Sequence, residues 1–495
     1  MTDTLSDTLL QQLSEFVAEQ MGLNFPRERW SDLQRGMISA LRELDLKDPE
    51  SLMQSFLSQS LTKTQMEVLT SHLTVGETYF FREPETFQIL KEEILPELMR
   101  SRWQNGKSLR IWSAGCSTGE EPYAIALLLT EMIPDLQNWN LTLLATDINT
   151  GSLRKAAEGS YTEWSFRGIE ESIKKKYFKR KEGRYEILPS IKRLVTFSYL
   201  NLAADTYPSV LNNTNSMDII FCRNVLMYFR PERMKKVIQN LYLSLAEDGW
   251  LIVSPYEVST DLFSQFTAIS LLGRTLYKKE EATRKLKDAS FKVQAPSDKF
   301  QEASFKMQDV GSKWKKPLIP ESLPLPSDIY EEALSLYRQG RYREALDKIT
   351  VLLSQNHHDV RAMELMARTL ANQGKLSEAL QWCERAIAAD KLNPRFHYLL
   401  ATIEQERGQI EEAISALKRT LYLDQNFVMA HVGLGRLAQR QGKTHESQRC
   451  FQNALSLLTA SDQEEIPPEA EGMTAGRLIE IIQTTQGMMK VKGEK

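Results

Sequence analysis

The 495-residue sequence has little cysteine and no long apolar run. It holds four cysteines: Cys116, Cys222, Cys383 and Cys450. They are far apart and form no C-x-x-C pair, so neither a disulfide framework nor a structural zinc site is expected. The most apolar stretch, 124–129, is far shorter than the roughly 20 residues that cross a bilayer. The acidic, polar N-terminus has no basic segment leading into an apolar run, as a signal peptide would. We therefore expect a cytoplasmic protein, without membrane insertion and without a bound metal.

The sequence also lacks an excess of either charge. It carries 62 Lys and Arg against 65 Asp and Glu, a formal net charge of −3. Proteins that coat nucleic acid carry a clear excess of cations, so nucleic acid is not an expected partner. Four arginines do lie close together near the N-terminus: Arg27, Arg29, Arg35 and Arg42. They indicate a solvated helix face or, alternatively, a docking patch for an acidic partner.

The length predicts about three domains at one per ~150 residues. Residues 1–75 show apolar residues at helical spacing and predict an all-α domain. Residues 76–282 alternate short apolar runs with amphipathic segments, which predicts an α/β domain with a mostly parallel sheet. Residues 283–327 lose periodicity and predict a flexible linker. A helical repeat follows over 328–460, and a tail of residues 461–495 ends the chain.

Five apolar runs predict the strands of the α/β domain: 109–113, 141–145, 193–197, 217–222 and 250–254. A helix is predicted over 120–132. Residues 177–187 place a charged, glycine-containing turn between aromatic and β-branched residues, which predicts a small β-hairpin subdomain.

The linker region is basic. Over 278–316, eleven Lys and Arg stand against six Asp and Glu. A six-residue segment, 289–294, recurs in nearly the same form at 303–308, and four prolines follow in ten residues. This composition is typical of a flexible linker, and a folded partner motif is the alternative.

The last third of the chain repeats with a period of 34 residues. Four glycines mark the period: Gly340, Gly374, Gly408 and Gly442. A small residue precedes each glycine by seven positions: Ala333, Ala367, Ala401 and Gly435. Small residues let paired helices approach closely, and glycine ends the first helix of each pair. The pattern resembles the tetratricopeptide repeat, an α-solenoid that binds proteins; structural padding is the alternative.

A glycine-containing loop follows the first predicted strand and leads into the helix at 120. Gly115 and Gly119 allow the backbone to approach a ligand, as in nucleotide-binding βαβ units. The full G-x-G-x-x-G fingerprint is absent, so a pyrophosphate cradle is not indicated. Glu120 and Glu121 would repel a phosphate but suit the sulfonium and ammonium of S-adenosylmethionine (SAM); the alternative is helix capping. Asp147, at the end of the second strand, is placed to accept hydrogen bonds from ribose hydroxyls.

Four motifs then occur in order: T-V-G-E-T-Y-F-F-R at 74–82, W-S-A-G-C-S-T-G-E-E-P-Y at 112–123, A-T-D-I at 145–148 and F-C-R-N-V-L-M-Y-F at 221–229. Together they resemble the CheR family of chemoreceptor glutamate methyltransferases, over residues 10–280. The fusion to tetratricopeptide repeats is similar to a known CheR arrangement in alternative chemosensory systems.

The resemblance implies a Rossmann-like methyltransferase domain that uses SAM and releases S-adenosyl-L-homocysteine. It implies cofactor contacts from Thr78, Arg82, Glu120, Asp147, Asn201, Leu202, Arg223 and Asn224. It implies catalytic roles for two residues. Arg82 would hold the acceptor or cofactor carboxylate, and Tyr228 would lie beside the methyl group; an ion pair and a packed ring are the alternatives.

Two segments depart from the family pattern, and a third bears on receptor recognition. The first motif has Gly76 where the family often has asparagine, so one cofactor contact is lost. The sequence after the fifth strand, S-P-Y-E at 254–257, replaces the usual G-H-S-E. The hairpin turn around Gly183 is short and basic rather than long and glycine-rich, which predicts receptor recognition without a C-terminal tether.

Methyl transfer to a glutamate needs little acid–base help. A carboxylate with a pKa of about 4.3 is already ionised at neutral pH, so a missing histidine dyad is expected. The enzyme must supply orientation and a dry site instead. The sequence thus predicts methylation of chemoreceptor cytoplasmic-domain glutamates, with an unidentified protein partner on the repeats. The alternatives are a differently targeted methyltransferase and a catalytically silent scaffold that works through its repeats.

Overall fold

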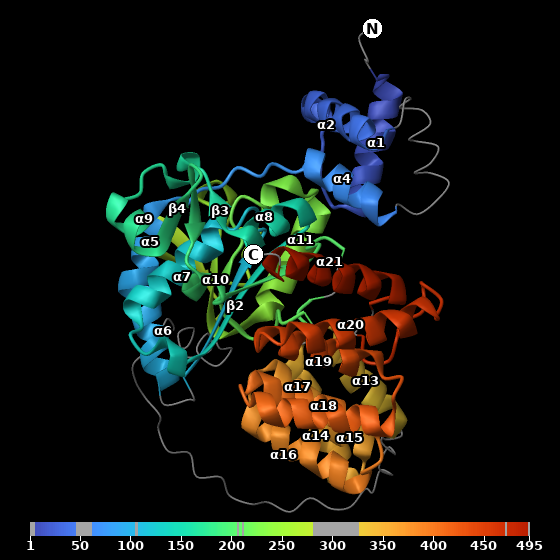
Figure 1. Cartoon of the computed structure of the whole chain (residues 1–495). Coiled ribbons are helices and arrows are strands. Elements are labelled where there is room, and N and C mark those ends of the chain that lie inside the picture. Colours follow the sequence, from blue (N-terminus) through green and yellow to red (C-terminus); the bar gives the residue numbers. More distant parts are fainter. Residues whose placement is uncertain are drawn as a thin grey trace, which may run out of the picture.

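A computed structural model of the chain describes residues 5–45, 62–103, 107–204, 207–209, 212–280, 326–470 and 473–493. It shows N-terminal helices, a central sheet covered by helices, and a C-terminal stack of helices (Figure 1). The predicted linker falls almost entirely outside the described residues. Within them, no helix combines the length and the apolar character needed to cross a membrane.

The N-terminal part consists of helices, as predicted: α1 (Asp7–Gln20), α2 (Trp30–Glu43) and α4 (Lys63–Leu73). Two of them begin at side-chain caps. The Ser6 hydroxyl accepts a hydrogen bond from the Leu9 amide, and Thr62 forms a reciprocal capping box with Gln65. The apolar faces of the three helices meet in one small core around Leu33, which is fully buried.

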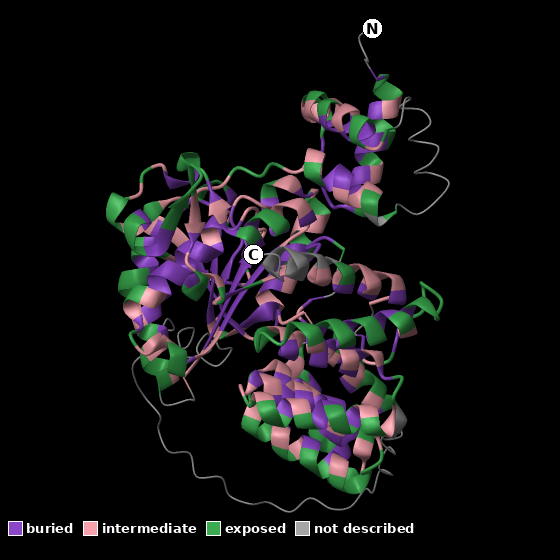
Figure 2. Cartoon of the chain, viewed as in Figure 1, coloured by how far each residue is buried: buried purple, intermediate pink, exposed green. Residues whose placement is uncertain are grey.

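The central sheet has seven strands in the order β6-β2-β1-β7-β8-β10-β9. Their bounds are β1 (Ser108–Ala114), β2 (Asn140–Asp147), β6 (Val195–Tyr199), β7 (Met217–Phe221), β8 (Leu245–Ile252), β9 (Thr267–Leu271) and β10 (Arg274–Lys278). The first five strands pair in parallel, and β10 and β9 add an antiparallel edge. The strand order reverses between β1 and β7, and ligands of such sheets bind at the carboxyl ends beside this point. Figure 2 shows that buried residues concentrate in this sheet.

Helices cover both faces of the sheet. The helices of this part are α5 (Pro84–Ile89), a π-helical turn (Leu90–Ile94), α6 (Leu95–Trp103), α7 (Glu120–Met132), α8 (Thr150–Glu158), α9 (Glu171–Tyr177), α10 (Pro189–Lys192) and α11 (Pro231–Ser244). Helix α7 has the predicted bounds. Burial on both faces explains why the parallel strands are continuous apolar runs.

Three parts of the sheet differ from the prediction. The fifth strand, β8, spans Leu245–Ile252 rather than 250–254, because Leu245 already pairs with Met217 of β7. The third strand begins at Val195 rather than 193, because α10 occupies Pro189–Lys192 and the chain turns after it. Strands β9 and β10 were not predicted. Exposed and half-buried residues alternate along β9, so this edge strand lacks the continuous buried run of the parallel strands.

The predicted hairpin is present within a small three-stranded sheet of order β3-β5-β4. It joins β4 (Phe178–Lys181) and β5 (Arg184–Ile187), and β3 (Ser160–Tyr161) pairs with β5. The turn has two residues, Glu182 and Gly183, with φ values of 49° and 77°. Two positive φ values suit the right-handed twist of a hairpin and favour glycine in the second position.

The C-terminal part contains four helix pairs, which confirms the α-solenoid prediction. They are α13 (Pro326–Arg338) with α14 (Tyr342–Gln355), α15 (Val360–Asn372) with α16 (Leu376–Ala389), α17 (Pro394–Glu406) with α18 (Ile410–Leu423), and α19 (Val428–Arg440) with α20 (Thr444–Thr459). The glycine of the period lies between the two helices of each pair, with φ of 72–77°. In the last pair, a Cβ on Gly435 would lie 2.7 Å from the Phe451 ring. Ser447, where the other repeats have alanine, donates a hydrogen bond to the Gly435 carbonyl at 2.8 Å.

The turns of the first three repeats lie against the amino-terminal edge of the sheet, away from its carboxyl ends. The first turn contacts Leu243 at the end of α11. Ser216, just before β7, donates to the Asn372 carbonyl at 2.8 Å. Asn140, at the start of β2, donates to the Glu406 carbonyl at 3.1 Å. Strands β7 and β2 are two positions apart in the sheet, which corresponds to about 10 Å. The turns of the second and third repeats contact the starts of these two strands, so the spacing of the turns matches the spacing of the strands.

The predicted tail, residues 461–495, contains a further helix, α21 (Ala475–Gly493). Helix α21 leaves the last repeat and packs against α8 and β6 (Figure 1). The Arg477 guanidinium lies 4.2 Å from the centre of the Tyr199 ring. The chain thus returns from the repeats to the central sheet at a second place.

Candidate cofactor-binding site

One pocket of the described residues lies where four parallel strands end. It encloses about 730 Å³ of space that opens to solvent. Its lining comes from the ends of β1, β2, β6 and β7 and from the N-terminal part: Met21, Leu23, Leu73, Thr74, Val75, Gly76, Gly115, Ser117, Asp147, Ile148, Asn149, Ser152, Leu200, Asn201, Leu202, Asn224, Val225, Tyr228 and Phe229. The lining mixes apolar side chains with a few polar groups, which suits a nucleoside.

The glycine-containing loop forms one wall and has no room for side chains at its two glycines. Gly115 has φ of 79°, and a Cβ there would lie 2.4 Å from a Val225 methyl group. Gly119 has φ of 91°, and its Cβ would lie 2.8 Å from Ala156. Both the backbone angle and the space therefore exclude a larger residue. The loop brings backbone into the pocket, as predicted.

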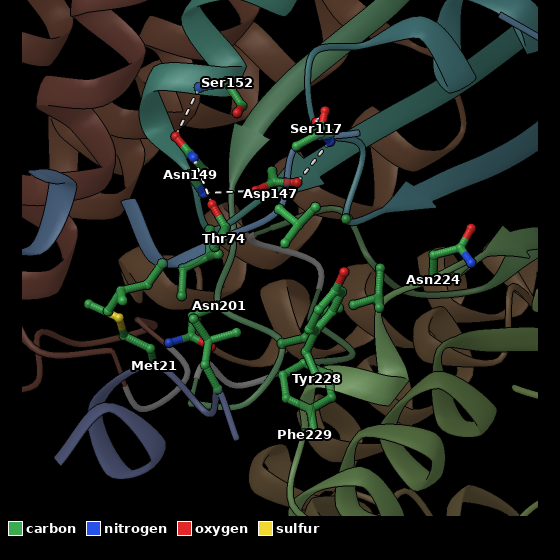
Figure 3. A pocket seen from close by; sticks show the side chains of 18 of the residues that line it. Met21, Thr74, Ser117, Asp147, Asn149, Ser152, Asn201, Asn224, Tyr228 and Phe229 are labelled. Atoms are coloured by element: carbon green, nitrogen blue, oxygen red, sulfur yellow. Dashed lines mark hydrogen bonds between the residues drawn. The ribbon is translucent and has the colours of Figure 1, made fainter. Parts of the chain in front are cut away.

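Asp147 lies at the centre of the polar side of the pocket (Figure 3). One carboxylate oxygen accepts from the Ser117 amide at 2.8 Å and the other accepts from the Asn149 amide at 2.8 Å. Burial raises the pKa of Asp147, and these amides and that of Ile148 oppose the shift. A carboxylate has about four acceptor sites, so the backbone amides of Ser117 and Asn149 leave acceptor capacity for ligand hydroxyls. This acceptor fits a ribose diol, whose hydroxyls would donate to it.

The N-terminal helices close the pocket on the opposite side. The Asn24 amide donates to the Tyr228 carbonyl at 2.7 Å, and Leu23 pairs with Phe229 as an isolated antiparallel bridge. Asn201, a predicted cofactor residue, donates its side-chain amide to the Gln20 carbonyl at 3.3 Å. Asn201 thus lines the pocket while it also fastens the N-terminal part to the sheet.

Tyr228 and Asn224 line the pocket at the end of β7, where the short helix Leu226–Tyr228 begins. The Tyr228 side chain extends into the pocket (Figure 3), and the Arg29 guanidinium lies 5.6 Å from its ring centre. Glu257 holds this turn: its carboxylate accepts from the amides of Asn224, Val225 and Leu226 at 2.8 Å each. The S-P-Y-E segment, which replaces the usual G-H-S-E, therefore anchors the turn through its glutamate.

Four of the predicted residues lie outside the pocket lining: Thr78, Arg82, Glu120 and Arg223. Glu120 is buried and accepts hydrogen bonds from the Thr118 and Ser165 hydroxyls at 2.6 and 2.9 Å. Burial raises its pKa, and these hydroxyls oppose the shift. The start of α7 has no side-chain cap hydrogen bond, so these hydroxyl contacts hold Glu120 without capping the helix. The cofactor contact of Glu120 stays a prediction.

Arg223 and Arg82 are linked to each other. Arg223 forms ion pairs with Glu83 at 3.1 Å and Glu121 at 3.0 Å, and it donates to the Arg82 carbonyl at 2.5 Å. The Arg82 side chain donates to the Glu77 carbonyl at 3.1 Å. Arg223 therefore holds the 77–83 segment beside the pocket, and the substrate-facing role of Arg82 stays a prediction.

Sequence reasoning missed several pocket residues. Ser117 and Asn149 contribute their backbone amides to Asp147, and Asn149 also caps α8 by accepting from the Ser152 amide at 3.0 Å. An asparagine directly before a helical segment is a cap signal that was available. Met21 and Leu23 come from another part of the chain, and no local pattern in the sequence links them to this pocket.

A doubly wound sheet, a glycine-containing loop after β1 and an acidic residue after β2 define a nucleoside-binding methyltransferase site. The comparisons with known proteins agree. Residues 76–271 match the family model described as CheR methyltransferase, SAM binding domain, and residues 330–394 match a tetratricopeptide repeat model. The chain belongs to the CheR family of chemotaxis protein methyltransferases. It is a SAM-dependent methyltransferase, and SAM is its cofactor.

Two curated relatives illustrate the match. The chain is 31% identical over 278 residues to chemotaxis protein methyltransferase 2 of Vibrio cholerae. The aligned region covers 56% of this chain and 94% of that protein. It is 32% identical over 251 residues to the chemotaxis protein methyltransferase of Borreliella burgdorferi, covering 50% of this chain and 87% of that protein. Among solved structures, MamA of Desulfovibrio magneticus aligns over 28% of this chain and 77% of its own, at 23% identity and a TM-score of 0.26.

Proposed function

We propose that the protein transfers the SAM methyl group to glutamate side chains of a chemoreceptor cytoplasmic domain. The relatives named chemotaxis protein methyltransferase support this acceptor. The observation that carries the proposal is the chemistry of the pocket. Among its described lining residues, the ionisable side chains are those of Asp147 and Tyr228, and both carboxylate oxygens of Asp147 already accept backbone amides.

A pocket without a free base suits an acceptor that arrives as an anion. A lysine acceptor has a pKa near 10.4 and must lose a proton before it can attack, whereas a glutamate with a pKa near 4.3 is already ionised. When bound, SAM supplies an electrophilic methyl group on a sulfonium. The chain supplies orientation, through the loop at Gly115 and the turn at Tyr228, and excludes water through Met21 and Leu23.

The residues present fit the cofactor. Asp147 would accept the ribose hydroxyls, and the apolar side chains of Ile148, Leu202 and Val225 would border the base. Asn201 and Asn224 add polar groups to the same wall. Arg82, on the segment that Arg223 holds, would attract the acceptor carboxylate to the pocket edge. Met227 and Tyr256 are exposed beside the Tyr228 turn and offer an apolar surface for a receptor helix.

Methyl transfer from labelled SAM to a purified receptor cytoplasmic domain tests the proposal, with methanol release in base as the readout. We expect base-labile label that disappears in Asp147→Ala and falls in Arg82→Ala. Asp135→Ala serves as a matched control, because that acid is far from the pocket and pairs with Lys107 at 2.9 Å. Label that survives base treatment would identify an N-methyl product and would contradict the glutamate assignment.

A further inference from the structure

Two arginines of neighbouring repeats point at the same place on the repeat stack. Arg368 belongs to α15 and Arg395 to α17, which are the first helices of the second and third repeats. Both reach the Glu364 carboxylate: Arg368 at 2.8 Å and Arg395 at 3.9 Å. One glutamate balances only one of these two cations. The site therefore favours a second carboxylate.

The chain itself supplies that second carboxylate. After α20 the segment 461–470 returns to the stack, and Glu469 reaches both arginines. One oxygen accepts from the Arg395 Nε atom at 2.6 Å, and the other accepts from the Arg368 guanidinium. The Glu469 side chain is only 3% exposed. Burial alone would raise its pKa, but Arg368 and then Arg395 outweigh burial and the pKa is lowered, so the group is an anion.

The backbone at Glu469 is in an unfavourable conformation. Its φ is 63°, in the left-handed region that residues with a side chain rarely adopt. The contact with the arginines holds the residue there. The surrounding segment, 462–471, contains five acids and no base, with two adjacent prolines. It thus has the composition of an acidic linear peptide rather than of a helix connection.

A third arginine, Arg436, lies on α19, the first helix of the fourth repeat. A pocket between α17 and α19 is lined by Tyr398, Thr402, Gln405 and Arg436, among others. Tyr398 lies one helical turn after Arg395 on the same helix. Burial lowers the pKa of Arg436, and the nearby Arg440 lowers it further, while Tyr398 raises it. An anionic ligand there would offset both effects, because an opposite charge favours the charged guanidinium.

We propose that the first-helix face of the repeats, formed by Arg368, Arg395, Tyr398 and Arg436, binds an acidic peptide of a partner protein. A glutamate or aspartate of that peptide occupies the place between Arg368 and Arg395. In the free protein, Glu469 fills this place as an internal ligand. A partner therefore binds by replacing a segment of the chain itself.

The probe for this proposal is a fluorescent synthetic peptide with the sequence of residues 461–472, added to the full-length protein. Binding is measured by anisotropy. Glu469→Gln removes the internal carboxylate, so we expect this variant to bind the peptide at least tenfold more tightly than the wild type. Binding should weaken as salt rises, because a charge pair carries it. A peptide with glutamine at the Glu469 position should bind at least tenfold more weakly.

A second substitution locates the site. Arg395→Gln in the Glu469→Gln background should abolish peptide binding, and Arg395 is half exposed, so its loss is not expected to unfold the stack. Arg385→Gln is the matched control, because this arginine lies on α16 over the Trp382 ring. Thermal unfolding of each variant verifies folding.

Three outcomes would overturn the proposal. Equal peptide binding by the wild type and Glu469→Gln would show that Glu469 does not occupy the site. No binding by folded Glu469→Gln would leave the contact a purely internal one. Concentration-dependent dimerisation of the wild type, suppressed by Glu469→Gln, would assign the site to the same segment of a second copy.

Discussion

Arg110 and Glu406 form an ion pair that joins the catalytic sheet to the third repeat. Their side chains approach to 2.6 Å and are only 11% and 5% exposed. Arg110 also donates to the Asn213 side chain at 2.6 Å, and its position near the start of β1 places it at the edge where the repeat turns dock. The pair is buried between two parts of the chain that the sequence presents as separate domains.

We expect Glu406→Gln to detach the repeats from the sheet. Breaking one member of a buried pair leaves an unpaired charge and costs about 3–5 kcal/mol. Small-angle scattering should therefore show a larger radius of gyration. Glu404→Gln on the same helix is the control. Among the ion pairs of the described residues, Glu404 takes part only in the one with Arg407 of its own repeat, at 2.8 Å. An unchanged radius in Glu406→Gln would contradict this role.

We expect Asp147→Asn to weaken SAM binding. The substitution removes the charge that ribose hydroxyls would meet, and a hydrogen bond to a charged group contributes about 1.5–3 kcal/mol. Affinity measured by calorimetry should fall about 10- to 100-fold. Because Asp147 also holds the amides of Ser117 and Asn149, thermal unfolding without SAM must show that the variant is folded. Unchanged affinity would refute the assignment.

The position of Asp147 was predictable, and much of the pocket was not. An acid after the second apolar run must lie at the carboxyl edge of a parallel sheet, since the alternation of strands and helices determines that edge. Ser117 contributes only a backbone amide, and its residue type gives no signal for it. A motif shows which residues occur together but not which contact each makes, so the partners of Arg223 became evident only in the structure. The N-terminal residues Met21 and Leu23 reach the pocket through tertiary packing.

The raised pKa of the buried Glu120 predicts how the stability of the protein depends on pH. Burial raises its folded pKa above the ordinary value of 4.5. The folded state therefore holds this proton more tightly than the unfolded state does. The stability from this group is complete below pH 4.5 and is lost as pH rises through the folded pKa. We expect the Tm of Glu120→Gln, relative to the wild type, to increase between pH 4.5 and 7.5. A constant Tm difference across this range would contradict a raised pKa.

The short hairpin turn predicts how the protein recognises its receptor. Glu182 and Gly183 form a two-residue turn, flanked by the exposed cations Lys181 and Arg184, and it is too short to enclose a peptide. We expect receptor methylation to proceed at the same rate when the receptor lacks its C-terminal tail. Micromolar binding of a tail peptide, measured by calorimetry and lost in Arg184→Ala, would show that the hairpin grips a tether after all.

Helix α21 contacts two parts of the chain that the proposals treat separately. It follows directly from the Glu469 segment, and it packs against α8, whose first turn borders the SAM pocket at Asn149 and Ser152. A change in affinity that passes through one shared element is reciprocal. Whatever factor SAM imposes on the affinity of an acidic peptide, the peptide imposes the same factor on SAM. Two titrations, each with and without the other ligand, must therefore return one number, and that number measures how strongly this helix connects methyl supply to partner binding.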